Sequence, residues 1–309
     1  MGIMRNILLW GSRSKTLREV LPHFPFVRRA VSRFMPGEEI HDALTAAATL
    51  QRQGIAAVVT HLGENLSQEN EAKSVAQHYL EVLELIHQRK LDCHISLKLT
   101  QLGLDFDEEL CYKHLITLVE RAYALENFVW IDMESSAYVD RTLNLYKRLR
   151  AEYSNVGVCL QSYLYRTKKD VETLLPIAPS IRLVKGTYAE PKHVAYKSKK
   201  DVDENFFVLS EQLLLAAQTN GAHLGIATHD RNLLQRIDQS ASRRDVSRKT
   251  YEIQMLFGIQ RETQLQLAKD GFQVRILISY GTFWFPWYMR RLAERPANVL
   301  FVLKNIFTR

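Results

Sequence analysis

Eight short runs of apolar and β-branched residues recur along this chain, and a longer segment with helical periodicity separates most of them. The runs lie at residues 56–62, 93–99, 128–134, 156–162, 180–186, 223–229, 251–257 and 274–280. They are nearly continuously apolar, as parallel strands that are buried on both faces of a sheet are. Eight such strands alternating with helices predict an α/β protein built as a closed (β/α)8 barrel of the TIM type.

An open, doubly wound sheet is the main alternative architecture. No GxGxxG follows the first run and the chain contains no GxxxxGK[ST] loop, which weighs against a Rossmann dinucleotide site or a P-loop. A length of 309 residues suits one large barrel, and no flexible linker interrupts residues 36–309. We therefore expect a single catalytic barrel at 36–309, preceded by a basic helical extension at 1–35.

The net charge of +7 allows attraction to nucleic acid, to anionic membranes or to acidic substrates, without choosing among them. No zinc-finger, RNP-like or helix-turn-helix signature is present, so a non-enzymatic nucleic-acid binder has little support.

The segment from Met1 to Phe34 mixes apolar residues with many arginines. It is either a peripheral membrane contact or a capping helix with a solvated basic face. We expect no signal peptide and no membrane span, and a location that is cytoplasmic or peripheral at the inner face of the cell membrane.

Polar and charged side chains gather where the predicted strands end, which is where barrel enzymes place their active sites. They are Lys98, Asp132, Glu134, Gln161, Arg182, Lys185, Thr228, His229, Asp230 and Tyr280, and Gly186 follows Lys185. Any one of them could instead cap a helix or form a structural ion pair, but their joint occurrence favours an active site. No metal site is expected, because His229 has no second histidine at i+4 and these candidates include only three carboxylates. The three cysteines are far apart, so neither a disulfide framework nor structural zinc is expected.

Cations are unusually frequent among these candidates, and they suit a phosphate-bearing cofactor and a small acid. Arg290 and Arg291 add to them in the segment YMRRLAERPANVLF, which is predicted to be a helix that ends near Pro296. Adjacent helical residues lie about 100° apart, so both guanidinium groups can flank one carboxylate. A solvated basic face is the alternative, although the preceding FWFPWY argues against it. Gly186 would let a ligand approach the backbone closely.

From about Arg33 to the C-terminus the chain resembles the monofunctional bacterial proline dehydrogenases, which are flavoproteins. The resemblance rests on RFMPGEEIHDAL, HLGEN, SLKLTQLGL, DMES, LQSYLYRT, IRLVKGTY, ATHD, YEIQMLFG, YG with Trp284, and YMRRLAERPANVLF. It implies a distorted barrel with N-terminal helices and a last helix over the carboxyl ends of the strands, and noncovalently bound FAD. It also implies oxidation of L-proline to Δ1-pyrroline-5-carboxylate by hydride transfer to flavin N5, with reoxidation by membrane quinone, as the first step of proline catabolism.

The resemblance assigns roles to individual residues. Asp132 and Arg182 would be catalytic, with Arg182 beside flavin N5 and Asp132 paired with Lys98. The substrate would contact Lys98, Tyr188, Leu256, Tyr280, Arg290 and Arg291, of which the two arginines would clamp the proline carboxylate. FAD would contact Met133, Gln161, Arg182, Lys185, Gly186, Thr187, Thr228 and His229.

Two positions depart from the family pattern. Trp287 stands where a tyrosine is usual, so a larger ring would reshape the pocket, and Thr187 stands where alanine is common. Tyr280 is retained and would crowd the 4-carbon of the substrate ring, which predicts a preference for proline over 4-hydroxyproline. No aldehyde dehydrogenase domain follows the barrel, so a separate enzyme is expected for the second catabolic step. The alternative function is a flavin-free barrel enzyme that acts on a phosphorylated or carboxylate small molecule.

Overall fold

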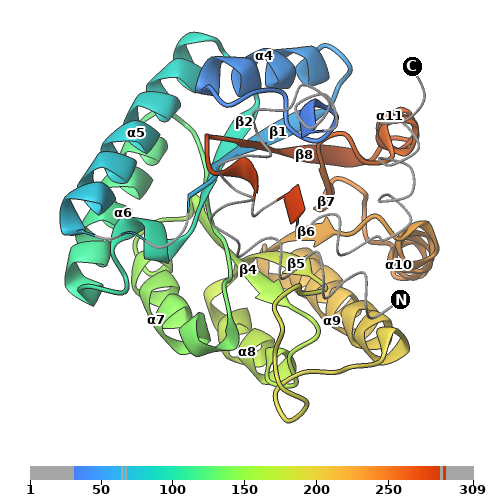
Figure 1. Cartoon of the computed structure of the whole chain (residues 1–309). Helices are drawn as coiled ribbons and strands as arrows, with labels where there is room; N and C mark the ends of the chain where they lie inside the picture. The colour runs from blue at the N-terminus through green and yellow to red at the C-terminus, as the bar shows by residue number, and fades with distance from the viewer. Residues whose placement is uncertain (1–30, 64–65, 67, 286–287, 290–309) are drawn as a thin grey trace.

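The computed structural model describes residues 31–63, 66, 68–285 and 288–289. Eight parallel strands close into a barrel in the order of the sequence (Figure 1). They are β1 (Ala56–His61), β2 (Cys93–Leu97), β3 (Val129–Ile131), β4 (Val156–Gln161), β5 (Ser180–Val184), β6 (His223–Ala227), β7 (Tyr251–Leu256) and β8 (Gln273–Tyr280). The predicted fold class is confirmed, and seven of the eight predicted runs contain a strand, while β8 begins one residue before its run.

Eight α-helices in the described residues surround the barrel (Figure 1). They are α4 (Ile40–Gln51), α5 (Glu69–Gln88), α6 (Glu108–Ala124), α7 (Val139–Arg150), α8 (Thr167–Leu174), α9 (Lys199–Asn220), α10 (Arg231–Arg243) and α11 (Arg261–Lys269). Three short 3-10 helices, η2 (Leu99–Leu102), η3 (Ser136–Tyr138) and η4 (Leu175–Ile177), lie in the connections. Asp107 and Asp230 begin α6 and α10 by accepting hydrogen bonds from Leu110 N and Leu233 N, which satisfies otherwise unpaired backbone donors.

Helix α5 shows how the outer layer fixes the strands that carry the site. Its buried residues are Ala72, Ala76, Tyr79, Val82, Leu83 and Ile86, and their helical spacing places them on one face. Tyr79 is fully buried, and its hydroxyl accepts from His61 N and donates to Ser96 O. One side chain therefore joins the ends of β1 and β2 and holds their register.

Barrel closure depends on the pairing of β1 with β8, which runs from Ala56↔Arg275 to His61↔Tyr280. Arg275 Nη1 also donates to Ala57 O at 2.9 Å across this seam. The register brings Tyr280, the last residue of β8, beside His61, the last residue of β1. Closure is thus what places these two rings together at the carboxyl end of the barrel.

Most of the predicted last helix, with Arg290, Arg291 and Glu294, lies outside the described residues, as do Trp287 and nearly all of the predicted extension at 1–35. The chain just before the helix is anchored, because Trp284 is buried and its Nε1 donates to Glu38 Oε1 at 2.8 Å. Within the described part of the chain, no helix has the length and apolarity needed to cross a membrane.

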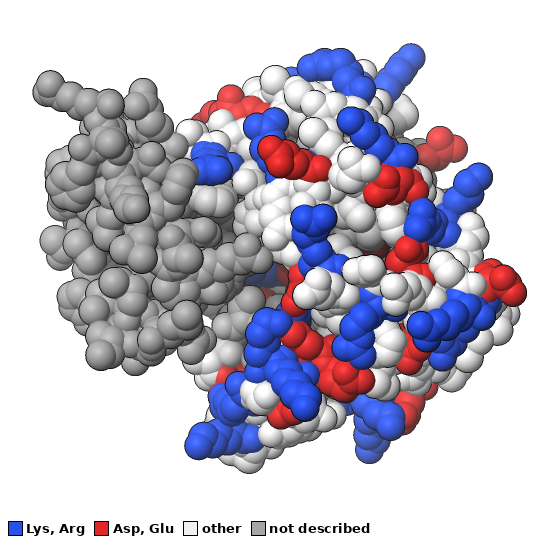
Figure 2. Space-filling model, turned by 90° about the vertical axis from the view of Figure 1, so that its right-hand side faces the viewer, with Lys and Arg blue, Asp and Glu red and all other residues white. Residues whose placement is uncertain are grey.

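The surface carries charges of both signs. Figure 2 shows Lys and Arg side chains interspersed with Asp and Glu over one face of the molecule, rather than gathered in a single basic field. Arg236, for example, pairs with Glu204 and Arg248 pairs with Asp238. This pattern on this face does not resemble the continuous basic stripe of a nucleic-acid interface.

Candidate active site

Arg182 lies in the middle of β5, points into the barrel and is only 3% exposed. A buried guanidinium is costly unless it is paired and hydrogen-bonded. Its Nη1 donates to Asp132 Oδ1 at 2.7 Å and to Ser96 Oγ at 2.9 Å, while its Nε donates to Gln254 Oε1 at 2.5 Å. The Trp130 ring lies 4.7 Å from the guanidinium carbon. Side chains from three other strands, β2, β3 and β7, therefore fix its position.

Asp132 directly follows β3 and connects two of these partners. It accepts a hydrogen bond from Ser96 Oγ at 2.8 Å as well as the ion pair with Arg182. The two residues to which the family resemblance assigned catalytic roles are thus in direct contact. Since an ionised carboxylate only accepts hydrogen bonds, Ser96 and Arg182 together hold Asp132 in one orientation.

Two buried polar atoms beside this cluster have no hydrogen-bond partner among the described residues. They are Arg182 Nη2 and Gln161 Oε1, on the neighbouring strands β5 and β4. Gln161 Nε2 donates to Glu134 O at 3.1 Å, which fixes the amide and leaves its oxygen unpaired. An unsatisfied buried donor or acceptor costs about 1–3 kcal/mol, so a ligand that offers both an acceptor and a donor would stabilise this region.

Lys185, the first residue after β5, is held in an ion network. Its Nζ lies 2.5 Å from Asp203 Oδ1 and 3.1 Å from Asp230 Oδ2, and Lys199 contacts the same two carboxylates. Burial would raise the pKa of Asp230, but the two lysines outweigh it and lower the pKa to about 2. The network ties the end of β5 to α9 and α10, and the predicted contact of Lys185 with FAD remains a prediction.

Gly186 adopts a positive φ of 107°, a conformation that L side chains rarely take. A Cβ atom here would lie 2.1 Å from Tyr163 Cδ1. The glycine is therefore required by the packing of Tyr163, whose backbone N donates to Lys185 O. The sequence had suggested close approach of a ligand as the reason, whereas the observed neighbour belongs to the protein itself.

The remaining predicted contacts lie at the same end of the barrel. Met133, the second residue after β3, and Thr228, the first after β6, are buried, and Leu256 ends β7. His229 Nε2 accepts from Leu256 N at 3.0 Å, which assigns the ring proton to Nδ1 when the imidazole is neutral. Lys98, Thr187 and Tyr188 also follow strands directly or closely, with Lys98 and Tyr188 partly buried and Thr187 exposed.

Tyr280 is buried beside two histidines that the sequence analysis did not single out. Its hydroxyl lies 2.8 Å from His78 Nε2, and its ring centroid lies 5.2 Å from that of His61. Burial raises the pKa of Tyr280, so its phenol stays protonated. His61 Nδ1 is a further buried atom with no hydrogen-bond partner in the described part of the chain. His61 ends the first strand, so the strand-end rule that found the other candidates could have found it as well.

His61 predicts a pH dependence of stability. Burial, then His78 and Lys98, lower its pKa from 6.5 to about 4. Between these values the unfolded chain binds a proton that the folded protein does not, so the contribution of His61 is fully present above pH 6.5 and is lost as the pH falls toward 4. The slope is at most about 1.4 kcal/mol per pH unit. We expect His61→Phe to make urea unfolding less pH-dependent between pH 6.5 and 4.5. An equal difference between variant and wild type at every pH in this window would contradict the assignment.

Comparison with known proteins decides the family. The model of the family described as "Proline dehydrogenase" matches residues 43–304. The chain belongs to the proline dehydrogenase family.

Relatives in the family match over nearly the whole chain. Proline dehydrogenase 1 of Bacillus subtilis subsp. natto is 36% identical over 304 residues, which cover 98% of this chain and 99% of the relative. Proline dehydrogenase of Deinococcus radiodurans is 35% identical over 279 residues, 89% of each chain. Among solved structures, proline utilization A of Bdellovibrio bacteriovorus superposes with a TM-score of 0.83 at 20% identity. That match covers 94% of this chain and 36% of the longer protein, and it supports the barrel fold.

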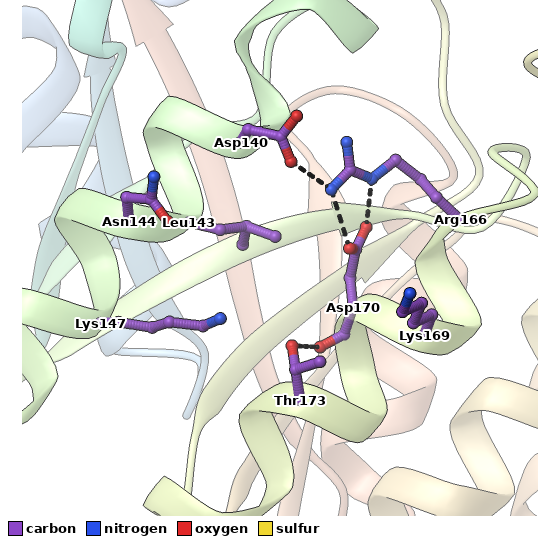
Figure 3. A pocket seen from close by; sticks show the side chains of 8 residues that line it. All are labelled: Asp140, Leu143, Asn144, Lys147, Arg166, Lys169, Asp170 and Thr173. Carbon is purple, nitrogen blue, oxygen red and sulfur yellow. Dashed lines mark hydrogen bonds and ion pairs between the residues drawn. The ribbon is translucent and has the colours of Figure 1, made fainter.

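A surface hollow of about 400 Å³ lies between α7 and α8, away from the cluster around Arg182. Figure 3 shows that Arg166 in this hollow is bound to both Asp140 and Asp170. No site residue expected from the sequence lines it. Among the described residues, moreover, no three His, Cys, Asp or Glu side chains gather as metal ligands. The candidate active site is therefore the cluster around Arg182 at the barrel mouth.

Proposed function

We propose that this protein is an FAD-dependent proline dehydrogenase that oxidises L-proline to Δ1-pyrroline-5-carboxylate, the first step of proline catabolism. The observation that carries the proposal is Arg182, which is fixed by Asp132, Ser96 and Gln254 yet keeps one buried nitrogen without a partner. Family membership supports the substrate and the reaction class.

The donor set fits a flavin. Arg182 Nη2 offers hydrogen-bond donation and Gln161 Oε1 offers acceptance, and a flavin ring carries both kinds of partner on its edge. When bound, FAD supplies the electron acceptor for the amine oxidation. We propose that Met133, Lys185, Gly186, Thr187, Thr228 and His229 complete its noncovalent site.

The protein's own contribution is electrostatic and geometric. We propose that Arg182, which Asp132 holds in place, is a preorganised cation that stabilises the negative charge on the reduced flavin. We propose that Lys98, Tyr188, Leu256 and Tyr280 enclose proline. Arg290 and Arg291, which lie outside the described residues, are proposed to bind its carboxylate through two guanidinium forks.

The deciding experiment is a visible absorption spectrum of the purified protein before and after anaerobic addition of L-proline. Bound flavin that loses its absorption on addition of proline is the expected result. Flavin that stays oxidised would contradict proline as the substrate and would favour another amine, with a pocket reshaped by Trp287. A protein that takes up no flavin, even with added FAD, would favour the alternative enzyme that acts on a phosphorylated or carboxylate substrate.

Substrate preference gives a separate prediction. Tyr280 is 1% exposed and its hydroxyl contacts His78, so its ring cannot turn aside for a substituent at the 4-carbon of the substrate. One unfavourable contact of this kind is worth about 1–3 kcal/mol, or roughly 10–200-fold. We expect kcat/KM for proline to exceed that for 4-hydroxyproline by such a factor. Comparable values for the two substrates would contradict the proposed place of Tyr280 in the site.

We propose membrane quinone as the electron acceptor and a peripheral contact at the inner face of the cell membrane. The membrane contact is supported by the net charge of +7 together with the arginine-rich, apolar segment at residues 1–30. Co-sedimentation with anionic liposomes that is lost on deletion of residues 1–30 is the expected result. Unchanged co-sedimentation after the deletion would contradict the membrane contact.

A further inference from the structure

A chain of buried polar side chains leads from the base of the barrel to Arg182. On β7, Glu252 and Gln254 are two residues apart, so both point into the barrel. Gln254 Oε1 accepts from Arg182 Nε, and Gln254 Nε2 donates to Glu252 Oε1. Both oxygens of Glu252 accept from Arg275 Nε, at 3.2 and 3.0 Å. All four residues are buried, at most 7% exposed, so their side chains depend on one another for hydrogen bonds.

The chemistry of the two ends fixes the direction of the Gln254 amide. A guanidinium can only donate hydrogen bonds and a carboxylate can only accept them. The amide oxygen must therefore face Arg182 and the amide nitrogen must face Glu252. Burial alone would raise the pKa of Glu252, but Arg275 and His223 hold the pKa below its ordinary value, so the carboxylate stays ionised. The reversed amide would place N–H groups against the N–H of Arg182 and an oxygen against a carboxylate.

Strand β6 lies between β5 and β7, and it leaves room for this contact because it carries a glycine. Gly225 pairs with Arg182 on one side and with Glu252 on the other. A Cβ atom at Gly225 would lie 2.6 Å from Gln254 Nε2. Gln254 can therefore extend across β6 to reach Arg182 only because no side chain stands between them.

We propose that Gln254 and Glu252 are positioning residues that orient the Arg182 guanidinium toward the flavin. The inference rests on the proposed function, since it names how that site is held in place. Asp132 and Ser96 accept hydrogen bonds from Arg182 Nη1, whereas Gln254 accepts one from Nε. The two contacts together set the plane of the guanidinium and hence the direction of Nη2.

Two variants test the proposal on the holoenzyme. Gln254→Met removes the acceptor for Arg182 at similar volume, and Glu252→Gln removes the charge that fixes the amide. We expect each to lower kcat by about 10–100-fold, as misplacement of a catalytic group does, with KM for proline nearly unchanged. We also expect the midpoint potential of the bound flavin, measured by reductive titration without proline, to become more negative, because a misdirected cation favours the reduced form less.

Asp92→Asn is the matched control. Asp92 is the second carboxylate beside Arg275, at 3.1 Å, but its side chain is exposed and does not touch Gln254. This variant is expected to lower the thermal midpoint while leaving kcat and the flavin potential unchanged. A flavin-bound Gln254→Met protein with wild-type kcat and wild-type flavin potential would overturn the proposal. An Asp92→Asn protein whose kcat and flavin potential fall as far as those of Glu252→Gln would overturn it as well. If Glu252→Gln does not fold, Gln254→Met still decides. The flavin potentials can be measured without proline, so they test the positioning role even if proline is not the substrate. Failure of proline to reduce the flavin of the wild-type protein would overturn the proposed substrate instead.

Discussion

Replacing Arg182 by lysine is expected to lower kcat by at least about 100-fold, because removal of one preorganised donor typically costs about 10²–10³-fold. Lysine keeps the positive charge but lacks the planar fork. A single ammonium cannot hold Asp132, Ser96 and Gln254 in their present positions and still direct a further N–H toward a ligand. The positive charge would remain in the barrel, but no N–H group would be directed toward the ligand.

Arg166→Lys provides the matched control for this substitution. Arg166 also forms a fork, with Asp170 Oδ2 at 2.9 Å from its Nε, but it lies in the hollow between α7 and α8 (Figure 3). We expect its replacement to leave kcat unchanged and to cost at most about 1 kcal/mol of stability, as partly exposed ion pairs do. Steady-state kinetics with proline distinguishes the two variants. An Arg182→Lys enzyme within about threefold of wild type would mean that charge alone is sufficient.

Gly186→Ala is expected to give the largest loss of stability, about 2–5 kcal/mol in the free energy of unfolding. Two costs combine, since alanine is strained at a φ of 107° and its Cβ would overlap the Tyr163 ring. Tyr163 is hydrogen-bonded to Lys185 O, so its displacement would also disturb the end of β5. We therefore expect weaker retention of flavin in this variant.

Gly54→Ala separates the two costs. Gly54 also has a positive φ, of 73°, but nothing lies within 4 Å of a Cβ atom built there. Its replacement carries backbone strain alone, which amounts to about 1–2 kcal/mol. Urea unfolding of both variants measures the difference. Equal losses for the two alanine variants would show that Tyr163 moves aside without cost, contrary to the expectation.

The barrel could be predicted from the sequence because the strands are largely buried on both faces and therefore consist mostly of apolar residues. The strand ends were less predictable. The third run was expected at 128–134, whereas β3 ends at Ile131. Asp132 still donates its backbone N–H to Leu97 O, but its side chain turns to Ser96 and Arg182. A side-chain interaction across the barrel, which no local pattern reports, thus accompanies the end of this strand.

The candidate site was predicted in part for a similar reason. Residues that follow parallel strands must meet at one end of a barrel, so Asp132 and Gln161 could be named from strand order alone. Ser96 and Gln254 could not, because their contact with Arg182 depends on register between strands and on the missing side chain at Gly225. Their alternation within otherwise apolar strands was the only local signal that they point inward.

The seam between β1 and β8 has a consequence for how the protein is made. Arg275 and Ala57, which meet across it, are 218 residues apart in the chain. During synthesis β1 emerges early and must wait with one edge unpaired until β8 leaves the ribosome. Contacts of such high sequence separation form slowly, and exposed strand edges invite association with other chains. The nascent barrel is therefore most vulnerable to misassembly before β8 has left the ribosome, and protection by chaperones would matter most in that interval.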